Sequence, residues 1–452
     1  MNTQSFKNFT VGDHVVFERS YSLADFAAFS KLSGDGNPLH HETGYAERSS
    51  FGRLIVPLHI TLAPLSMIAG MVFPGEPSLY LGHEVHAARP VHYDETIRYS
   101  ARIETINTAR SVLGLRVLAL RGAEVVLDAR MRVQALKDEW ETPPTLVVRK
   151  ASEPGLAVVT GAAGEIGGAI ACALAAKGWR LLLQDRGKKE SRQLVEERLA
   201  RLGAKAEFIA ADLATAEGRA DLAGAVSARE DIGLLIHAAS PPVNATTEDL
   251  VAVNFTAFKS LIDAALPAML LRQKAAVVLI SSIATEHSLP GWEAYAGAKS
   301  MAASLSNGVE QKYSPYGVRG LAILPGLVAT KFSEAYRDEE TSALLPQEVG
   351  EAVLRQIDDD APGNAMILEV GRQQRGRIGF HLPGAVRSAA TTAAESPEHE
   401  TTPEAAPSAV AATLRKVLRL APGTDVSQAE LGITPGWDSL KHLELLLEIE
   451  AA

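Results

Sequence analysis

The feature that most constrains the fold is a regular alternation over residues 155–380. Short apolar runs, among them LAVVTG, WRLLLQD, IGLLIHAA, AAVVLISS and VRGLAILPG, are separated by stretches with helical periodicity. Such alternation indicates βαβ units, which place successive strands in a parallel sheet with helices on its faces. We therefore predict an α/β domain of the Rossmann type for residues 155–380.

A glycine-rich turn opens this domain. The run LAVVTGAAGEIGGAIACALAAKGWRLLLQD is typical of a strand, a tight turn, a helix and a second strand. Glycines at such a turn let backbone N–H groups approach a pyrophosphate at the helix N-terminus. A sharp turn without a ligand would use the same residues, so the turn alone leaves nucleotide binding open.

A second motif, YAGAK, adds a candidate proton-transfer group. It places Tyr295 and Lys299 one helical turn apart, and Ser282 lies thirteen residues before the tyrosine. A tyrosine at its ordinary pKa of ~10 is a poor acid–base group, and a nearby ammonium lowers that pKa by favouring the phenolate. The serine hydroxyl could hold a substrate carbonyl beside the phenol. The pattern predicts reduction or oxidation at a carbonyl carbon.

Together these motifs resemble the short-chain dehydrogenases/reductases over about residues 155–372. The resemblance implies an NADPH- or NADH-dependent 3-oxoacyl reductase-like enzyme, with Tyr295 as proton donor, Lys299 as its partner and Ser282 as carbonyl holder. It implies that Asn254, in VAVNFTAF, supports a proton-relay water. The cofactor-binding positions that it implies are Gly161, Gly164, Ile166, Gly167, Asp185, Arg186, Asp212, Pro325, Gly326 and Thr330.

Two departures from that family pattern bear on the site. The turn is TGxxGxxG, with Glu165 at the position of the usual middle glycine, and HAAS stands where the family usually has an N-A-G run. We expect His237, the first residue of HAAS, to be structural or adenine-side rather than catalytic. Asp185 would bond a ribose 2′-OH, whereas Arg186 could clamp a 2′-phosphate, so NADPH and NADH stay equally open.

Residues 1–140 have a different pattern. One helical stretch is followed by the alternating runs TIRYSARIETI, VLGLRVLALRG and EVVLDARMRVQAL, which predict strands of an α+β domain. A loop, SGDGNPLHH, carries Asp35, Asn37 and His40. An aspartate and a histidine five residues apart could share a water as general acid and base, although the bare residues fit ordinary turn chemistry equally well.

This block resembles the MaoC-like hot-dog proteins over about residues 10–136. The resemblance implies a hot-dog fold and an (R)-specific 3-hydroxyacyl dehydratase or enoyl hydratase, with Asp35 and His40 as the catalytic pair. It implies that Asn37 holds the loop and that His41 is a bystander.

The central helix of this block carries one departure from the hot-dog pattern. After FGRLIV, where the family usually has His-Gly-Met, this chain has Pro57, Leu58 and His59. The usual glycine lies beside the thioester carbonyl. We expect its loss either to crowd the thioester or to remove an N–H group from the oxyanion site.

Two polar joints and a tail complete the chain. We predict a linker at 141–154 and a flexible tether at 381–408, which is rich in Ala, Thr, Pro and Glu. Residues 409–452 regain helical periodicity, and PGWDSLKHLELLLEIE resembles the DSL motif of acyl carrier proteins. The resemblance implies a partial helical carrier segment with 4′-phosphopantetheine on Ser439, where a helix N-terminus favours a phosphate.

Composition narrows the function classes. A formal charge of −10 gives no basic excess for nucleic acid or an anionic membrane. The single cysteine, Cys172, fits a reducing compartment, and the start of the chain has no signal-peptide pattern. We expect a cytoplasmic protein and predict no metal site.

These parts predict a bifunctional enzyme of fatty-acid- or polyketide-like biosynthesis. It would reduce 3-oxoacyl thioesters on acyl carrier protein or CoA and interconvert 3-hydroxyacyl and trans-2-enoyl thioesters. A degradative hydratase/dehydrogenase on acyl-CoA, or an acyl-binding scaffold with a silent hot-dog domain, remains open. The resemblances also imply a homo-oligomer, most simply a dimer, and a phosphopantetheinyl transferase as a partner of the carrier segment.

Overall fold

The computed structural model describes residues 4–76, 78–153, 155–287, 289–337, 342–358 and 364–376. The predicted tether and carrier segment, with Ser439, lie outside the described residues. The described chain forms an antiparallel sheet followed by a mostly parallel sheet, and both belong to one compact unit within residues 1–380.

The first domain is built on a five-stranded antiparallel sheet of order β2-β4-β5-β6-β3. Its strands are β2 (His14–Arg19), β3 (Ser78–Ala87), β4 (Ile97–Asn107), β5 (Val112–Arg121) and β6 (Glu124–Ala135). A separate pair joins β1 (Gln4–Ser5) to β7 (Glu139–Trp140). Three of the five long strands, β4 to β6, fall on the alternating runs that predicted them.

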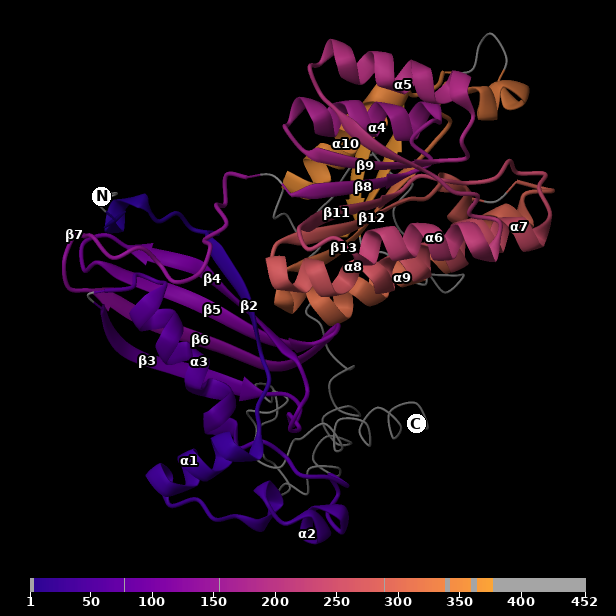
Figure 1. The fold of residues 1–452 in the computed structure, drawn as a ribbon. Coiled ribbons are helices and arrows are strands. Elements are labelled where there is room, and N and C mark those ends of the chain that lie inside the picture. Colours follow the sequence, from indigo (N-terminus) through magenta and orange to yellow (C-terminus); the bar gives the residue numbers. More distant parts are fainter. Residues whose placement is uncertain are drawn as a thin grey trace, which may run out of the picture. The chain divides into compact units, whose positions relative to one another are not determined.

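One helix, α3 (Leu58–Met71), lies over this sheet, whereas α1 and α2 lie below its end in Figure 1. Helix α1 spans Leu23–Ser33 and α2 spans Thr43–Glu47, and the 3-10 helices are η1 (Phe6–Asn8) and η2 (Pro38–His40). The residues alone indicated a single helical stretch here. Helix α3 is apolar on nearly all sides and α2 is five residues long, so neither gives a clear amphipathic period. Leu65 and Ile68 of α3 are buried in the core, and Tyr99 on β4 donates its hydroxyl to the Thr61 carbonyl at 2.8 Å.

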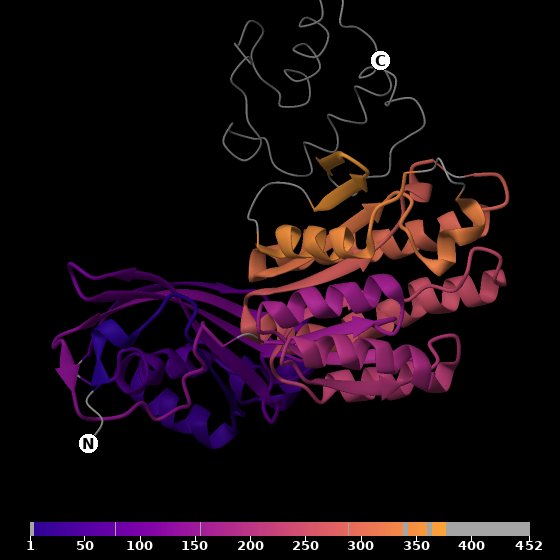
Figure 2. The same ribbon diagram turned by 90° about the horizontal axis from the view of Figure 1, so that it is seen from above.

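The second domain has an eight-stranded sheet of order β10-β9-β8-β11-β12-β13-β14-β15. All neighbouring pairs are parallel except the edge pair β14–β15, which Figure 2 shows in orange. This order confirms the predicted Rossmann-type domain. The strands before and after the β8–β11 pair are added on opposite sides of the sheet, which is the switch point of such folds. The strands are β8 (Leu156–Thr160), β9 (Arg180–Asp185), β10 (Ala206–Ala210), β11 (Ile232–His237), β12 (Ala275–Ile280), β13 (Val318–Pro325), β14 (Ala365–Glu369) and β15 (Arg372–Gly376).

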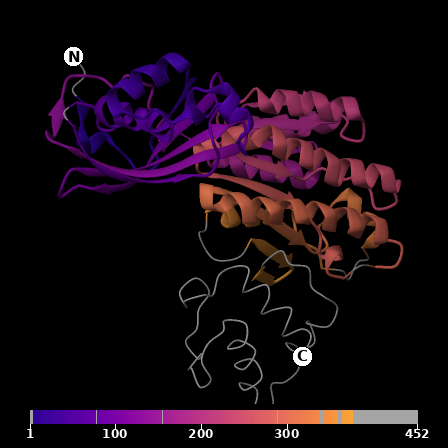
Figure 3. The same cartoon turned by 90° about the horizontal axis from the view of Figure 1, so that it is seen from below.

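Helices lie on both faces of this sheet. Figure 1 shows α4, α5 and α10 on one face, and Figure 3 shows α6, α8 and α9 side by side on the other. They are α4 (Glu165–Ala176), α5 (Lys189–Arg201), α6 (Ala216–Ser227), α7 (Thr247–Val251), α8 (Ala257–Arg272), α9 (Glu293–Tyr313) and α10 (Pro346–Asp358). The short helices are η3 (Ala252–Thr256), η4 (Ile283–Thr285), η5 (Ser314–Tyr316) and η6 (Lys331–Tyr336).

One continuous helical run, Thr247–Arg272, joins α7, η3 and α8. By length and hydropathy alone it could cross a bilayer, but half of its most apolar window is buried inside the domain. Phe258 and Leu261, for example, are buried in the core beside strands β11 and β12. The run therefore has the character of a core helix, for which high hydropathy is normal.

The end of α8 meets the sheet of the first domain. The Ser100 hydroxyl on β4 donates to the Leu271 carbonyl, and the Arg102 guanidinium donates to the Arg272 carbonyl at 3.1 Å. The buried Gln273 amide donates to the Ser100 carbonyl at 3.1 Å. Side chains from β4 thus satisfy carbonyls that the last turn of a helix leaves unpaired.

Candidate active sites

In the glycine-rich turn after β8, the backbone of Gly161 lies against that of Ala239, and the backbone of Gly167 lies against that of Gly161. Gly161 has φ +66°, and a Cβ there would lie 2.8 Å from the backbone of Ala239. A Cβ on Gly167 would collide with the Gly161 carbonyl. Gly164 is the N-cap of α4 and supplies no side chain to the first turn of that helix. The N–H groups of this turn therefore have no side-chain cap from their N-cap residue, which fits an anionic pyrophosphate.

Glu165, at the position of the usual middle glycine, is the first residue of α4. Its carboxylate accepts the Lys331 backbone N–H at 2.7 Å, which ties this turn to the start of η6. The neighbouring Ile166 is half-buried and packs on the core beneath the sheet.

At the end of β9, Asp185 is buried and its carboxylate is fully engaged. Arg192 on α5 donates to both carboxylate oxygens at 2.7 Å, and the Gly187 N–H donates at 2.6 Å. The hydrogen bonds to Asp185 raise the pKa of Arg192. Arg186 and Asp212 are exposed beside this strand end. Sequence reasoning missed Arg192, although a basic residue seven positions after the strand-end aspartate was available as a signal.

The predicted proton-transfer residues come together at the same edge of the sheet. Ser282 follows β12, and its side chain lies close enough to Tyr295 on α9 to affect the pKa of that phenol. Tyr295 is only 6% exposed. Burial raises the pKa of Tyr295 to about 12, and the side chain of Ser282 opposes that rise. The sequence predicted that a nearby ammonium would lower this pKa, but in this arrangement burial has the larger effect.

Lys299 lies one turn further along α9 and is completely enclosed. Its Nζ donates to the Ile280 carbonyl at 2.9 Å and lies 5.9 Å from the centre of the Tyr295 ring. Burial lowers the pKa of Lys299 to about 7. The side chain can therefore gain or lose a proton near neutral pH, as a proton relay requires.

Asn254 lies in the π-helical turn η3, between α7 and α8. Its Nδ2 donates to the Leu250 carbonyl at 2.9 Å, whereas its buried Oδ1 has no hydrogen-bond partner among the described residues. Buried polar atoms normally have a partner, so this oxygen fits a bound water. Single π-helical turns of this kind are frequent at functional sites.

His237 is the last residue of β11 and is part of a fully paired network. Its Nε2 donates to the Val253 carbonyl at 3.0 Å, and its Nδ1 accepts the Thr160 hydroxyl at 3.0 Å. Thr160 in turn accepts the N–H groups of Ala238 and Ala239 at 3.2 Å. Burial lowers the pKa of His237 to about 3. The structure places this residue between two strands and the helix η3, where it fastens backbone rather than facing an open site.

The loop after β13 completes this edge. Pro325 ends the strand, Gly326 donates its N–H to the Leu368 carbonyl at 2.7 Å, and the buried Thr330 caps η6. Helix η6 brings Phe332 to 6.0 Å from the Tyr295 ring.

Two aromatic side chains, Trp292 and Phe332, contact the ring of Tyr295, and a third, Tyr336, packs on Trp292; the sequence motifs did not point to them. Trp292 makes an edge contact with Tyr295 at 5.7 Å, and Tyr336 lies 4.9 Å from Trp292. Trp292 and Phe332 therefore give the tyrosine ring an aromatic environment. Their signal in the sequence was weak, because aromatic residues are equally common in ordinary cores.

In the first domain, Asp35 and His40 face each other across a loop. His40 Nε2 lies 3.8 Å from Asp35 Oδ2, and the side chains are 11% and 35% exposed. His40 Nδ1 donates to the Ile55 carbonyl at 2.8 Å, which leaves Nε2 unprotonated in the neutral ring. Tyr93 donates its hydroxyl to the His40 carbonyl at 2.9 Å.

The loop between α1 and η2 holds its shape through its own side chains. Asp35 accepts the Asn37 N–H at 3.0 Å, and Asn37 accepts the Leu39 N–H at 3.0 Å. Asn37 is thus the N-cap of η2. The exposed His41 is stacked on Phe26, whose ring also lies 5.8 Å from that of His40.

The three residues that replace His-Gly-Met form the start of α3. Pro57 is the N-cap of this helix and accepts N–H groups from Ile60 and Thr61 through its carbonyl. Leu58 is 40% exposed, and His59 is stacked on Phe29 at 6.4 Å.

Comparison with known proteins bears on both domains. Residues 155–341 match the family model described as short chain dehydrogenase. A very-long-chain 3-oxoacyl-CoA reductase of Anas platyrhynchos is 29% identical over 237 residues, which are 49% of this chain and 73% of the relative. A 3-hydroxybutyryl-CoA dehydratase of Methylorubrum extorquens is 26% identical over 138 residues, which are 30% of this chain and 88% of the relative.

Among solved structures, a 3-oxoacyl (acyl-carrier-protein) reductase from Agrobacterium tumefaciens with NADP bound is 27% identical. It covers 48% of this chain and 93% of that chain, with a TM-score of 0.44. The family match and the sheet order agree on the second domain. This part of the chain is a short-chain dehydrogenase domain, which is an oxidoreductase domain.

Proposed function

We propose that the second domain reduces 3-oxoacyl thioesters to 3-hydroxyacyl thioesters with NADPH. The observation that carries this proposal is that Ser282 and Tyr295 meet at one edge of the sheet, with the enclosed Lys299 one helical turn from the tyrosine. These groups lie at the carboxyl edge of the sheet, where the glycine-rich turn also lies. The similarity to a 3-oxoacyl-CoA reductase supports the substrate class.

The residues present fit a nicotinamide dinucleotide. The turn with Gly161, Gly164, Ile166 and Gly167 would hold its pyrophosphate, because a side chain at Gly161 or Gly167 would not fit. Asp185, Arg186 and Asp212 would flank the adenosine end, and Pro325, Gly326 and Thr330 the nicotinamide end. When bound, this cofactor supplies a hydride to the carbonyl carbon of the substrate.

The protein side chains handle the oxygen and the proton. The Ser282 hydroxyl would hold the carbonyl oxygen, and Tyr295 would give its phenolic proton to that oxygen as it becomes a hydroxyl. The phenolate that remains would regain a proton from solvent through Lys299 and a water held by Asn254. The lowered pKa of Lys299, about 7, suits such a relay at neutral pH.

The tyrosine is in the protonation state that reduction requires. With a pKa raised to about 12 by burial, the phenol stays protonated at neutral pH and is ready to donate its proton. Oxidation of a hydroxyacyl thioester would use the same residue as a phenolate.

The Asp185–Arg192 pair supports NADPH rather than NADH. Both carboxylate oxygens are already bonded to Arg192, so Asp185 has little capacity left for a ribose 2′-OH. Its charge is also neutralised, which removes the repulsion of a 2′-phosphate. The exposed Arg186 and Lys188 add positive charge at the same strand end.

For the first domain we propose a hot-dog fold that removes water from the 3-hydroxyacyl product. A five-stranded antiparallel sheet around the apolar helix α3 supports the fold, and the similarity to a 3-hydroxybutyryl-CoA dehydratase supports the reaction. One of Asp35 and His40 would take the C2 proton, and the other would protonate the departing 3-hydroxyl. The C–H electron pair becomes the C2=C3 bond, and the C3–O bond breaks to release water.

The replacement of the usual glycine does not by itself exclude this reaction. Leu58 keeps a backbone N–H in the first turn of α3, and its side chain is 40% exposed. Pro57 lacks an N–H, but it precedes the position that faces the thioester in the resembled family. The first-turn N–H groups of α3 would therefore serve as the oxyanion site.

The two reactions would run in sequence, with acyl chains on CoA or on a carrier. Attachment of phosphopantetheine to Ser439 by a transferase would raise the effective concentration of substrate at both sites. Homodimerisation and a cytoplasmic location are part of the same proposal.

The test is a product analysis. The purified chain is incubated with an acetoacetyl thioester and NADPH or NADH, and acyl products are identified by mass. Hydroxyacyl followed by enoyl product supports both proposals, with reduction lost in Tyr295→Phe and only the second step lost in Asp35→Asn. Hydroxyacyl product alone would overturn the dehydratase, and no reduction with either nucleotide would overturn the reductase.

A further inference from the structure

Three chain segments meet beside His40. Ile55 donates its N–H to the Leu39 carbonyl at 3.2 Å and accepts His40 Nδ1 at 2.8 Å. On its other side, Val56 donates its N–H to the Val91 carbonyl at 2.7 Å. The position of the His40 ring therefore depends on where the segment of residues 53–56 lies.

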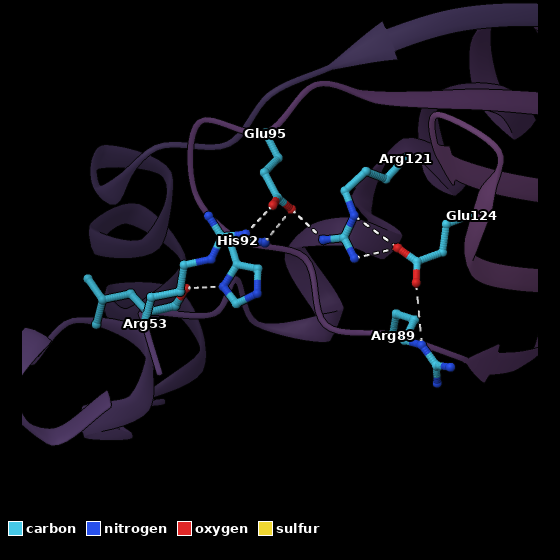
Figure 4. Close-up of polar contacts among 7 residues, drawn as sticks. Arg53, Arg89, His92, Glu95, Arg121 and Glu124 are labelled. Carbon is cyan, nitrogen blue, oxygen red and sulfur yellow. Dashed lines mark hydrogen bonds and ion pairs between the residues drawn. The ribbon is translucent and has the colours of Figure 1, made fainter. Parts of the chain in front are cut away.

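A single carboxylate fastens that segment. Glu95 accepts Arg53 Nη2 at 2.5 Å through one oxygen, and Arg121 Nη1 at 2.9 Å and the His92 N–H at 3.1 Å through the other. His92 Nδ1 donates to the Leu54 carbonyl at 2.8 Å. Figure 4 shows Glu95 between Arg53 and Arg121, with His92 beneath it.

The side chain of Glu95 is 16% exposed, so the contacts are partly shielded from water. Burial alone would raise the pKa of Glu95, but the His92 N–H and the two guanidiniums outweigh it and hold that pKa below its usual value. Beyond Arg121 the chain of contacts continues to Glu124 and Arg89, which do not touch residues 53–56 (Figure 4).

We propose that Glu95 is a positioning residue for the Asp35–His40 pair. It acts through Arg53 and His92, which hold residues 53–56 so that the Ile55 carbonyl orients the His40 ring and fixes its tautomer. The inference rests on the proposed dehydratase function of the first domain. Outer contacts that orient metal-ligating imidazoles commonly contribute about 10- to 100-fold to metal affinity or activity, and we take the lower end as the scale here.

Charge is central to this role. Without the carboxylate, two guanidiniums would face each other and the His92 N–H would lose its acceptor. The segment would then move by the fraction of an ångström that separates a productive geometry from an unproductive one. Glu124 is a matched control, because it has the same charge and shares Arg121 but does not contact Arg53 or His92.

The experiment compares Glu95→Gln with Glu124→Gln, and Arg53→Ala with Arg89→Ala. Arg53 and Arg89 are 59% and 63% exposed, so the second pair keeps the test valid if a buried-carboxylate variant fails to fold. The substrate is crotonyl-pantetheine, which has no phosphate and so excludes an effect of anion binding. We expect kcat for hydration to fall about tenfold in Glu95→Gln and Arg53→Ala, with KM within about twofold. We expect Glu95→Asp to recover part of the loss and the two controls to stay within about twofold of the parent.

Equal losses in Glu95→Gln and Glu124→Gln, or a loss confined to KM, would overturn the proposal. So would a loss seen with crotonyl-CoA but absent with crotonyl-pantetheine, because it would assign the arginines to phosphate binding.

A second measurement separates this inference from the proposed reaction. Nitrogen chemical shifts of labelled histidines, with His40 assigned through His40→Gln, report its tautomer without any substrate. We expect the Nδ1–H tautomer in the parent and Glu124→Gln, and a mixed population in Glu95→Gln. If the chain hydrates nothing yet the tautomer responds in this way, the dehydratase fails and the positioning role stands. An unchanged tautomer in Glu95→Gln would overturn the positioning role whatever the activity.

Discussion

Both candidate sites anchor their basic group to a backbone carbonyl, but they do so in different surroundings. Lys299 donates to the Ile280 carbonyl at 2.9 Å, and His40 donates to the Ile55 carbonyl at 2.8 Å. Lys299 and Tyr295 lie on a helix of 21 residues and are buried in the second domain. His40 lies on a single turn of 3-10 helix, opposite the half-exposed Asp35.

The difference indicates what each site depends on. In the second domain the long elements fix the geometry, and burial sets the pKa values of Tyr295 and Lys299. In the first domain the geometry depends on a few polar contacts between loops. A change to a single catalytic group in the second domain should therefore stop the chemistry without disturbing the geometry of the site. The site in the first domain can also be disturbed by changes at residues that do not touch the substrate.

The largest effect should come from Tyr295→Phe. It removes the proposed proton donor while keeping the ring that packs against Trp292 and Phe332. We expect reduction of an acetoacetyl thioester to fall about 10³-fold, within the usual range for loss of a general acid. Stopped-flow absorbance of the nicotinamide measures the rate, and an unchanged thermal midpoint serves as the control for folding. A loss below tenfold would assign the proton to another group.

The next largest effect should come from Asp35→Asn in the other site. The amide keeps the acceptor for the Asn37 N–H, so the loop retains that contact while the acid–base function is lost. We expect hydration of an enoyl thioester to fall about 10²-fold, with reduction unchanged. Ultraviolet absorbance of the enoyl group reports the first rate. If reduction falls as well, the two sites are not independent and the comparison fails.

Part of the fold and of the candidate site in the second domain could be predicted from the sequence. The β-α alternation predicted the second domain, because buried parallel strands give continuous apolar runs. The YAGAK motif found Tyr295 and Lys299 because helical spacing fixes their separation. For His237 the sequence predicted a structural or adenine-side role but not its hydrogen-bond partners, since Thr160 and Val253 come from other elements.

Contacts between distant segments could not be predicted from the sequence. Glu95 and Arg53 are 42 residues apart, and nothing local marks either of them as a partner of the other. The bond between Arg192 and Asp185 spans a strand end and a helix, so its effect on cofactor choice follows only from the folded geometry. Helix α3 was indistinct for another reason: a buried, apolar helix has no polar face to reveal its period.

A third, smaller effect tests whether the second domain also depends on a polar contact. Arg192→Ala should leave Asp185 with a free carboxylate at the ribose end, which attracts a 2′-OH and repels a 2′-phosphate. We expect kcat/KM with NADPH to fall about tenfold, an effect of the size of one charge-assisted hydrogen bond. We expect kcat/KM with NADH to stay unchanged or to rise. Steady-state rates with both nucleotides measure this. Equal losses with both would mean that Arg192 serves only to support the fold.

The last prediction concerns stability, not rate, and contrasts His237 with exposed histidines. The pKa of His237 is about 3 in the folded protein because burial disfavours its charged form, against about 6.5 when unfolded. Between these values the unfolded chain binds a proton that the folded chain does not. Stability from this group is therefore complete above pH 6.5 and is lost progressively as pH falls towards 3. His14, with a pKa lowered to about 4 by burial, should contribute in the same sense.

Urea unfolding between pH 8 and 4.5 measures that loss. His237→Asn should lower stability at pH 8 by about 2 kcal/mol, because the shorter side chain cannot span Thr160 and Val253 together. It should also make the decline below pH 6.5 shallower by up to one proton, about 1.4 kcal/mol per pH unit. His86→Asn, on the exposed side of β3, is the matched control and should change neither quantity. An unchanged slope in His237→Asn would mean that the acid sensitivity arises elsewhere, and His14→Asn would then be the variant to compare.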